Sequence, residues 1–280
     1  MQANRLAQIQ HNQAWLAPWA DLLAALQAQA HDLLGGLNQQ ALQRAVSTAQ
    51  GLPIRFVPQA ALPADCAYES FIYASGQVPS RDNLHDLFNA LIWLSYPRVK
   101  QQLNQIQARQ IAQAGIGQVR GAVRDGVTLF DENAAIVVLQ NDSEGAALAE
   151  ALRQHQWQAL FMEQRAAFGR SIQIHLFGHA LLEKLCQPYK AITAHAWLMW
   201  ADAGFFSASS ADQQAWIDDK LAQQLSGQTL DTRCFTPLPV LGVPGWWPAQ
   251  DAAFYADASV FRPRPEKRTA QDTKHKAAAT

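Results

Sequence analysis

Residues 81–96, which read RDNLHDLFNALIWLSY, carry the pattern that decides the fold. Apolar residues recur along this run at helical spacing, and Ser80 just before it is of a type that caps helix N-termini. The run therefore predicts a helix from Arg81 to Tyr96. His85 and Asn89 are four residues apart, so they share one face of that helix. The pattern predicts a helix packed in the core, with polar groups at the edge of its buried side.

Further helices are predicted on both sides of this segment. Pro97 disfavours helical geometry at the residue before it and starts a new helix. Gly76 stops a short helix, and Gly35-Gly36 separates two N-terminal helices that form an antiparallel hairpin. The helices predicted in this half of the chain span residues 12–30, 37–49, 68–74 and 97–113.

The C-terminal half adds the predicted β component. Residues 127–130 and 134–139 predict the two strands of a hairpin, because Asp131-Glu132-Asn133 between them favours a turn. Polar and apolar side chains alternate along residues 171–177, which predicts a third strand. The helices predicted in this half span residues 143–155, 157–168, 178–186, 192–201 and 211–225.

These elements predict the α+β class: a mainly helical single domain with a small β component, a hairpin plus one or two short strands. An N-terminal helical hairpin (1–50) is expected to pack on a main α+β domain (51–262). Within that domain, the Pro/Gly/Trp-rich residues 236–247 are expected to form a clasp on the surface. Residues 263–280 lack apolar periodicity and predict a disordered, mildly basic tail.

The bulk composition restricts the partners. The chain has 280 residues with 22 basic and 23 acidic side chains, so a basic footprint for nucleic acid or anionic lipid is missing from the sequence. No stretch reaches the roughly 18 apolar residues of a membrane helix, and the first residues lack a secretory pattern. The three cysteines form neither a metal knuckle nor a disulfide framework. We expect a cytoplasmic protein with no nucleic-acid and no membrane partner.

Residues with catalytic or metal-binding chemistry gather in three short blocks. The first lies on the helix predicted over 81–96 and is flanked by two cations. The second places a histidine and a glutamate four residues apart on one helix, a spacing at which two side chains can share a metal ion. The third is the pair of adjacent carboxylates in the predicted turn. The members are Arg81, His85, Asp86, Asn89 and Lys100; His179 and Glu183; and Asp131 and Glu132.

If the blocks converge, they define the pocket of a soluble metal-assisted hydrolase. A divalent metal would lower the pKa of a bound water, and a free carboxylate would act as the base. Mixed imidazole and carboxylate ligands suit Zn²⁺, Mn²⁺ or Fe²⁺. The predicted roles are catalysis by His85, Asp86 and Glu183; binding of a small-molecule or anionic substrate by Arg81, Asn89 and Lys100; and metal ligation by His85, Asp131, His179 and Glu183.

Two other interpretations fit the same residues. The blocks can be structural hydrogen-bond networks in a non-catalytic binding or adaptor protein. They can also belong to a metal-independent enzyme that uses His/Glu acid–base catalysis on a small molecule. The distances between His85, His179 and Glu183 test the metal-site hypothesis against these interpretations, because separations above about 8 Å exclude one shared metal ion.

Several segments resemble the bacterial family of unknown function DUF3025. The most specific are HDLFNALIW at 85–93 and FGHALLEK at 177–184. The similarity extends from about residue 52 to residue 263. It implies that the three polar blocks occur together in that family, and it implies no substrate, cofactor or catalytic role. The other similar segments are Tyr68-Glu69, 79–84, 97–104, 131–133 and 238–246.

Overall fold

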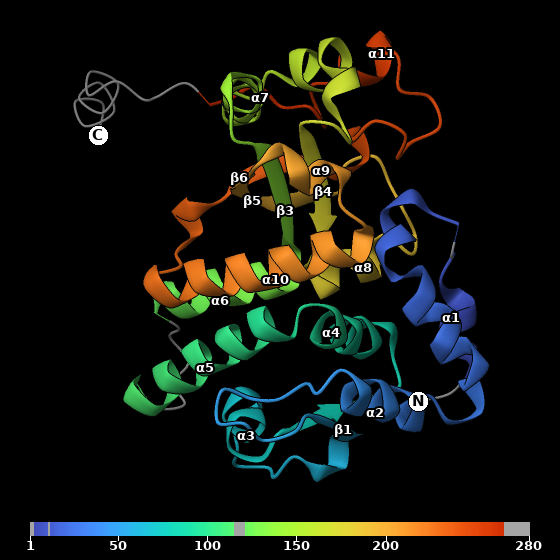
Figure 1. Ribbon diagram of the computed structural model, residues 1–280, viewed down its shortest axis with the longest axis vertical. Coiled ribbons are helices and arrows are strands. Elements are labelled where there is room, and N and C mark those ends of the chain that lie inside the picture. Colours follow the sequence, from blue (N-terminus) through green and yellow to red (C-terminus); the bar gives the residue numbers. More distant parts are fainter. Residues whose placement is uncertain (1–2, 11, 115–120, 266–280) are drawn as a thin grey trace, which may run out of the picture.

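The computed structural model describes residues 3–10, 12–114 and 121–265 and has the predicted α+β class with a helical majority (Figure 1). Its helices are α1 (Ala20–Ala28), α2 (Leu33–Gln43), α3 (Tyr68–Ser75), α4 (Leu84–Ser95), α5 (Pro97–Ala114), α6 (Ala122–Asn133), α7 (Ser143–Arg153), α8 (His179–Lys184), α9 (Ala203–Ser207), α10 (Ser210–Gly227) and α11 (Ala252–Tyr255). Its strands are β1 (Arg55–Pro58), β2 (Gln77–Ser80), β3 (Ala134–Gln140), β4 (Ile172–Leu176), β5 (Thr193–Ala201) and β6 (Thr236–Pro239).

The main sheet has four strands in the order β4-β3-β5-β6. β3 pairs in parallel with β5, while β4 and β6 run antiparallel to their neighbours. β3 reads AAIVVLQ and is buried almost throughout, as expected for a central strand covered on both faces. β1 and β2 form a separate parallel pair.

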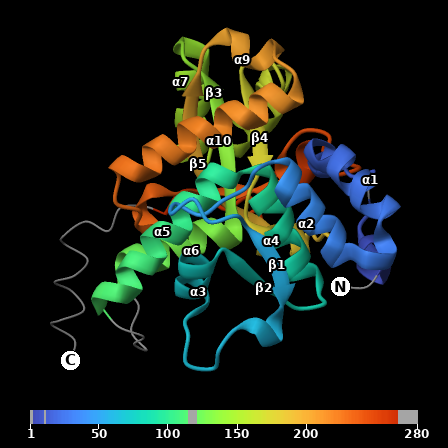
Figure 2. The ribbon, with the colours of Figure 1, turned by 60° about the horizontal axis from the view of Figure 1, so that its bottom comes forward.

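Helices separate the two sheets. In Figure 1, α10, α6, α5 and α4 form a layer below the main sheet, and α2, α3, β1 and β2 lie on the other side of that layer. Figure 2, which brings this lower side forward, shows α3 and the β1–β2 pair in front of α4. α8 follows β4 and packs on both α4 and α6. This arrangement brings α3, α4, α6 and α8 around one space.

The central helix α4 begins three residues later than predicted. Asn83, not Ser80, is its N-cap: the Asn83 side chain accepts a hydrogen bond from the Asp86 amide at 2.7 Å, whereas Ser80 ends β2. Gly35 and Gly36 lie inside α2 instead of ending a helix, and Asp32 caps α2. Both differences concern where a helix begins. More than one residue near each start can cap a helix, and residue preferences alone do not show which one forms the N-cap.

The predicted hairpin is wrong. Residues 122–133 form α6, and β3 begins directly after it. Val127 and Phe130 are buried three residues apart on one side of the helix. An apolar run as short as 127–130 does not distinguish strand from helix, and the turn-forming residues 131–133 are the last turn of α6.

The predicted helix over 192–201 is also wrong, because residues 193–201 form β5. β5 is covered on both faces over most of its length, so a strict two-residue alternation of polar and apolar side chains is missing. Its alanines, which have high helix propensity, are buried by tertiary packing instead.

The ends of the chain pack on the rest of the described structure. Trp19 donates a hydrogen bond from Nε1 to Ser95 Oγ of α4 at 2.9 Å, and the apolar side chains of the N-terminal helices join one continuous core. The predicted clasp contains β6, and Trp246 packs near Trp15 with ring centroids 6.0 Å apart. The division at residue 50 stays a prediction, and most of the predicted tail (266–280) lies outside the described residues. No helix of the described residues is long and apolar enough to cross a membrane.

A buried histidine makes stability depend on pH. Burial lowers the pKa of His175, on β4, from 6.5 to about 4. The unfolded chain takes up this proton near pH 6.5 and the folded chain does not until about pH 4, so stability falls as pH falls through that window. We expect His175→Phe to remove about 2 kcal/mol of the stability difference between pH 7 and pH 5, measured by urea unfolding. The exposed His31→Phe serves as control, and an unchanged pH dependence in His175→Phe would contradict the assignment.

Candidate functional site

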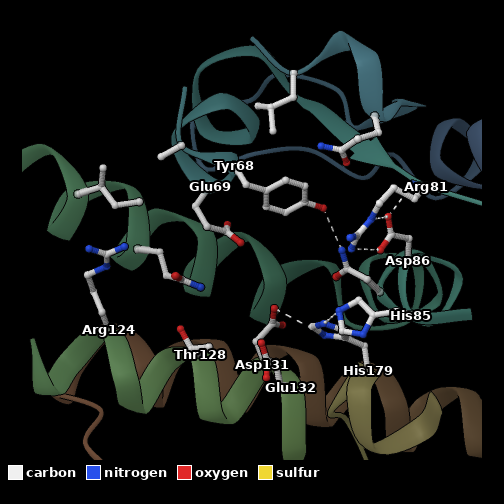
Figure 3. Close-up of a pocket in the computed structure, with 16 residues that line it drawn as sticks. Tyr68, Glu69, Arg81, His85, Asp86, Arg124, Thr128, Asp131, Glu132 and His179 are labelled. Carbon is white, nitrogen blue, oxygen red and sulfur yellow. Dashed lines mark hydrogen bonds and ion pairs between the residues drawn. The ribbon is translucent and has the colours of Figure 1, made fainter. Parts of the chain in front are cut away.

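The three predicted polar blocks meet in one pocket of about 560 Å³. Figure 3 shows its walls: α3 lies on one side, α6 lies on the other, and α4 and α8 close one end. α6 presents Arg124, Thr128 and Asp131 to the pocket because these residues are spaced four and three apart on one helix face. The pocket residues labelled in Figure 3 are Tyr68, Glu69, Arg81, His85, Asp86, Arg124, Thr128, Asp131, Glu132 and His179.

A chain of three side chains crosses the closed end of the pocket. Glu183 Oε2 lies 2.9 Å from His85 Nδ1, and His85 Nε2 lies 3.0 Å from His179 Nε2. The two imidazole rings meet edge to face, with centroids 4.5 Å apart. The His85 side chain keeps 31% of its surface exposed and lines the pocket, whereas His179 is buried.

The hydrogen bonds assign the protons in this chain. A carboxylate only accepts, so Glu183 fixes the hydrogen of His85 on Nδ1 and leaves its Nε2 as an acceptor. His179 then donates from Nε2 to His85. The buried Nδ1 of His179 lies 3.8 Å from Asp131 Oδ2, and the His179 ring also interacts with the Asp131 backbone. A carboxylate therefore lies beside each histidine, Glu183 beside His85 and Asp131 beside His179, and each can respond when the proton moves between the two Nε2 atoms.

A second network holds Asp131. Lys100 Nζ donates to both oxygens of Asp131, at 2.6 and 2.8 Å, and to Asn89 Oδ1 at 2.8 Å. Asn89 donates from Nδ2 to Tyr68 Oη at 3.1 Å. Lys100 and Asp131 are both buried, so their opposite charges compensate each other in a region of low dielectric.

Burial and these charges shift the pKa values in the site. Burial is the largest effect on His179 and lowers its pKa to about 4, despite the opposing influence of Asp131. For Asp131, burial raises the pKa, but Lys100 and His179 together outweigh it, so the pKa is lowered. At neutral pH the site therefore holds a neutral His179 beside an ionised Asp131.

Two carboxylates and a phenol line other parts of the pocket. Arg81 holds Asp86 through its backbone amide at 2.6 Å and its guanidinium at 2.9 Å. Burial is the main cause of a raised pKa in both Tyr68 and Glu69. Tyr68 therefore keeps its phenolic proton, and its oxygen already accepts from Asn89, which leaves its O–H as a donor for the pocket.

Arg124 is the cation that the pocket leaves without a counter-ion. Its Nε is buried and has no hydrogen-bond partner among the described residues, and no described carboxylate forms an ion pair with it. In Figure 3 it stands at the opposite end of the pocket from His85 and His179. Because it precedes Asp131 by seven residues on α6, about 10 Å of helix separates the two. This end of the pocket suits an anionic group.

The predicted substrate-binding residues already form hydrogen bonds or ion pairs with other residues of the protein. Arg81 binds Asp86, while Lys100 and Asn89 bind each other. Arg81 and Asn89 still line the pocket, whereas Lys100 lies behind its wall. Asp86 is a pocket residue held by Arg81, and His85 faces the interior of the site.

The four predicted metal ligands lie close together but do not face one point. His85 and His179 converge through their Nε2 atoms, whereas Glu183 lies behind His85 on its Nδ1 side and Asp131 is occupied by Lys100. Within the described parts of the chain, no group of three or more His, Cys, Asp or Glu side chains is arranged to hold a metal ion. The two imidazole Nε2 atoms are therefore the part of the predicted set that comes nearest to sharing a metal ion.

The pocket also contains Tyr68, Glu69, Arg124 and Thr128, which were not predicted from the sequence. The signal for two of them was present: Arg124, Thr128 and Asp131 follow the four-plus-three spacing of one helix face. Assigning residues 127–130 to a strand hid that spacing. Tyr68 and Glu69 carry no comparable local signal, because only the packing of α3 beside α5 brings them to the site.

The fold and the pocket define an α+β protein with a histidine–carboxylate site that lines a pocket. A family model described as "Protein of unknown function (DUF3025)" matches residues 54–265, and because the match covers most of the chain, the chain belongs to this family. No curated protein and no solved structure matches the chain. The matched range contains every residue of the pocket.

Proposed function

We propose that the protein is an enzyme that moves protons to and from a small anionic molecule bound in this pocket, with His85 as the acid–base group. The observation that carries the proposal is the Glu183–His85–His179 chain, which opens into the pocket at His85. A carboxylate behind the imidazole fixes its tautomer and stabilises the imidazolium that forms when it takes a proton. His85 exchanges its hydrogen bond from His179 for one from the substrate, and its Nε2 then accepts and returns the proton.

The other pocket residues define the substrate in outline. Arg124 supports binding of a carboxylate or phosphate at one end, because its guanidinium has no counter-ion among the described residues. About 10 Å separates this end from the histidines, so the substrate carries its anionic group several bonds away from the reacting proton. Tyr68 offers a phenolic O–H between them.

The convergence of the three blocks weighs against a non-catalytic adaptor. A purely structural network satisfies its buried polar atoms, whereas this site leaves the buried Nε of Arg124 without a partner among the described residues. Unsatisfied groups beside a pocket are typical of sites that bind a ligand. A location in the cytoplasm and the absence of nucleic-acid and membrane partners stay predictions from composition.

Metal-assisted hydrolysis is the second proposal, and one observation favours it. The Nε2 atoms of His85 and His179 point at each other, while carboxylates lie near both Nδ1 atoms. Histidines that bind metals usually have such carboxylates behind them. Here both Nε2 atoms would hold Zn²⁺, Mn²⁺ or Fe²⁺ once the two rings turn so that both lone pairs face the ion, and the metal would lower the pKa of a bound water.

The proposed reaction can be sought directly. Wild-type protein is incubated in D₂O with a pool of small carboxylic acids and phosphate esters, and mass spectrometry follows loss, product formation and deuterium uptake. We expect at least one component to change, and we expect His85→Gln to slow that change about 100- to 10,000-fold. Conversion at the wild-type rate in His85→Gln would contradict the proposal.

Two further arms of this experiment sharpen the result. His31→Gln, a substitution of an exposed histidine outside the pocket, should keep the wild-type rate. Protein treated with a chelator should also keep its activity if the shared proton is the working group. Loss of activity on chelation, restored by one of the three metals, would favour the second proposal.

A further inference from the structure

A second pocket lies at the edge of the main sheet, away from the histidine site. β6 covers β5 only from Thr193 to Ala196, where Ala196 pairs with Thr236. β3 covers the other edge of β5 from His195 to its end. Residues 197–201 of β5 therefore have no strand beside them on the β6 side among the described residues. Figure 1 shows β5 and β6 at this edge of the sheet.

The direction of the backbone groups on β5 follows from two hydrogen bonds. Successive residues of a strand point their N–H and C=O groups to opposite edges. The carbonyl of Ile192 accepts from Val240 at 3.0 Å on the β6 side, and the carbonyl of Ala201 accepts from Asn141 at 2.8 Å on the β3 side. Even-numbered residues thus face the β6 side.

Leu198 and Trp200 consequently aim their backbone donors and acceptors at the uncovered edge. Both residues line a pocket of about 760 Å³. Trp200 is 39% exposed, which is unusual for so large an apolar residue. An uncovered strand edge beside an exposed aromatic ring is the arrangement that accepts an added strand.

The charge around this edge is positive. Arg153 at the end of α7, Arg233 before β6 and Arg264 line the pocket, and Glu150 is its one acidic lining residue among the described residues. Arg233 and Arg264 also bind Asp231 and Gln154, so they are held in place by the protein. Asp231 offsets the charge of Arg233, and Arg153 and Arg264 outnumber Glu150, so the edge keeps a net positive charge that favours an acidic occupant.

We propose that the uncovered half of β5 binds an extended acidic peptide segment of a partner protein, which adds to the main sheet as a strand in line with β6. Its backbone would pair with Leu198 and Trp200, an apolar side chain would pack on the Trp200 ring, and its carboxylates would meet the arginines. β6 already binds the first half of β5 in this way. This surface is independent of the proposed acid–base chemistry.

The charge of the chain's own C-terminal residues argues against them as the occupant. Residues 266–280 contain four Lys or Arg side chains and two acidic ones. Their net positive charge is the same sign as that of the three arginines in the pocket.

A fluorescein-labelled peptide of alternating Glu and Val with a central Phe tests the proposal by fluorescence anisotropy. Two further versions carry N-methyl groups on either the odd or the even residues. Only one set of amides in an added strand points at β5, so one methylated version should bind about tenfold or more weakly while the other keeps its affinity. Bound peptide should also slow alkylation of Cys234, which is exposed in the same pocket.

Substitutions locate the binding. Arg153→Glu and Trp200→Ala should each weaken the unmodified peptide about tenfold, while Arg109→Glu, the same charge change at an exposed position of α5, should leave it unchanged. Four results would overturn the proposal. They are no binding by the full chain, equal weakening by both methylation patterns, full affinity in Arg153→Glu and Trp200→Ala, and binding only after residues 266–280 are removed, which would identify the tail as the occupant.

Discussion

Lys100→Met should destabilise the protein by about 3–5 kcal/mol, because it leaves Asp131 as an uncompensated charge in the core. Lys100 donates to both oxygens of Asp131 and to Asn89, and both charged groups are buried. Methionine fills a similar volume, so the loss of the charge and its hydrogen bonds dominates the effect. Urea unfolding at pH 7 measures it.

The double variant Lys100→Met/Asp131→Asn identifies the cause. If the buried charge is responsible, removing the carboxylate recovers most of the lost stability. Lys220→Met, a substitution of an exposed lysine on α10, should change stability by less than about 0.5 kcal/mol. A single variant as stable as wild type, or a double variant no better than the single one, would show that the ion pair does not support the site.

Gly178→Ala is the second substitution with a large expected effect. Gly178 joins β4 to α8, and a Cβ atom there would lie 2.5 Å from the backbone N and Cα of Asn133. Backbone atoms at a helix–strand junction cannot move independently, so α8 would be pushed away from α6. We expect a loss of about 3 kcal/mol in urea unfolding and a wider separation of His179 from Asp131.

The control for Gly178→Ala is another glycine in ordinary backbone geometry. A Cβ atom at Gly204, in α9, would meet nothing within 4 Å. Gly204→Ala should therefore be neutral or stabilise the protein by up to about 1 kcal/mol. Equal stability of the two variants would mean that the close approach at Gly178 is not a constraint.

The sequence correctly predicted those helices in which the spacing of apolar residues matches the buried face. The helix ended by Gly76 and the helix capped by Asp142 both agree with the structure, because each carries an apolar stripe together with a defined start or end. Part of α6 was predicted as a strand and β5 as a helix, because burial by the rest of the fold, and not local periodicity, determines the secondary structure of these segments. Phe130 is buried beneath Trp197 of β5, a contact between residues far apart in the sequence.

The residue types of the site were more predictable than their roles. His85, His179 and Glu183 stand out in a weakly charged sequence, and the structure places His179 and Glu183 each within hydrogen-bond distance of His85. Sequence spacing places Glu183 on the same helix as His179 but does not reveal that it reaches across to His85. Tyr68 has no such signal because only the packing of α3 beside α5 brings it to the pocket, whereas the strand predicted over 127–130 hid the position of Arg124 on the pocket face of α6.

The most direct test of the account is the rate of the reaction found in the D₂O experiment, compared between wild type, Glu183→Gln and His85→Gln. Glutamine keeps the shape of Glu183 but removes the charge that stabilises an imidazolium on His85. The account predicts that Glu183→Gln lowers the rate roughly 10- to 100-fold and that His85→Gln lowers it further, while His31→Gln matches wild type. Wild-type rates in both Glu183→Gln and His85→Gln would contradict an acid–base role for this pocket.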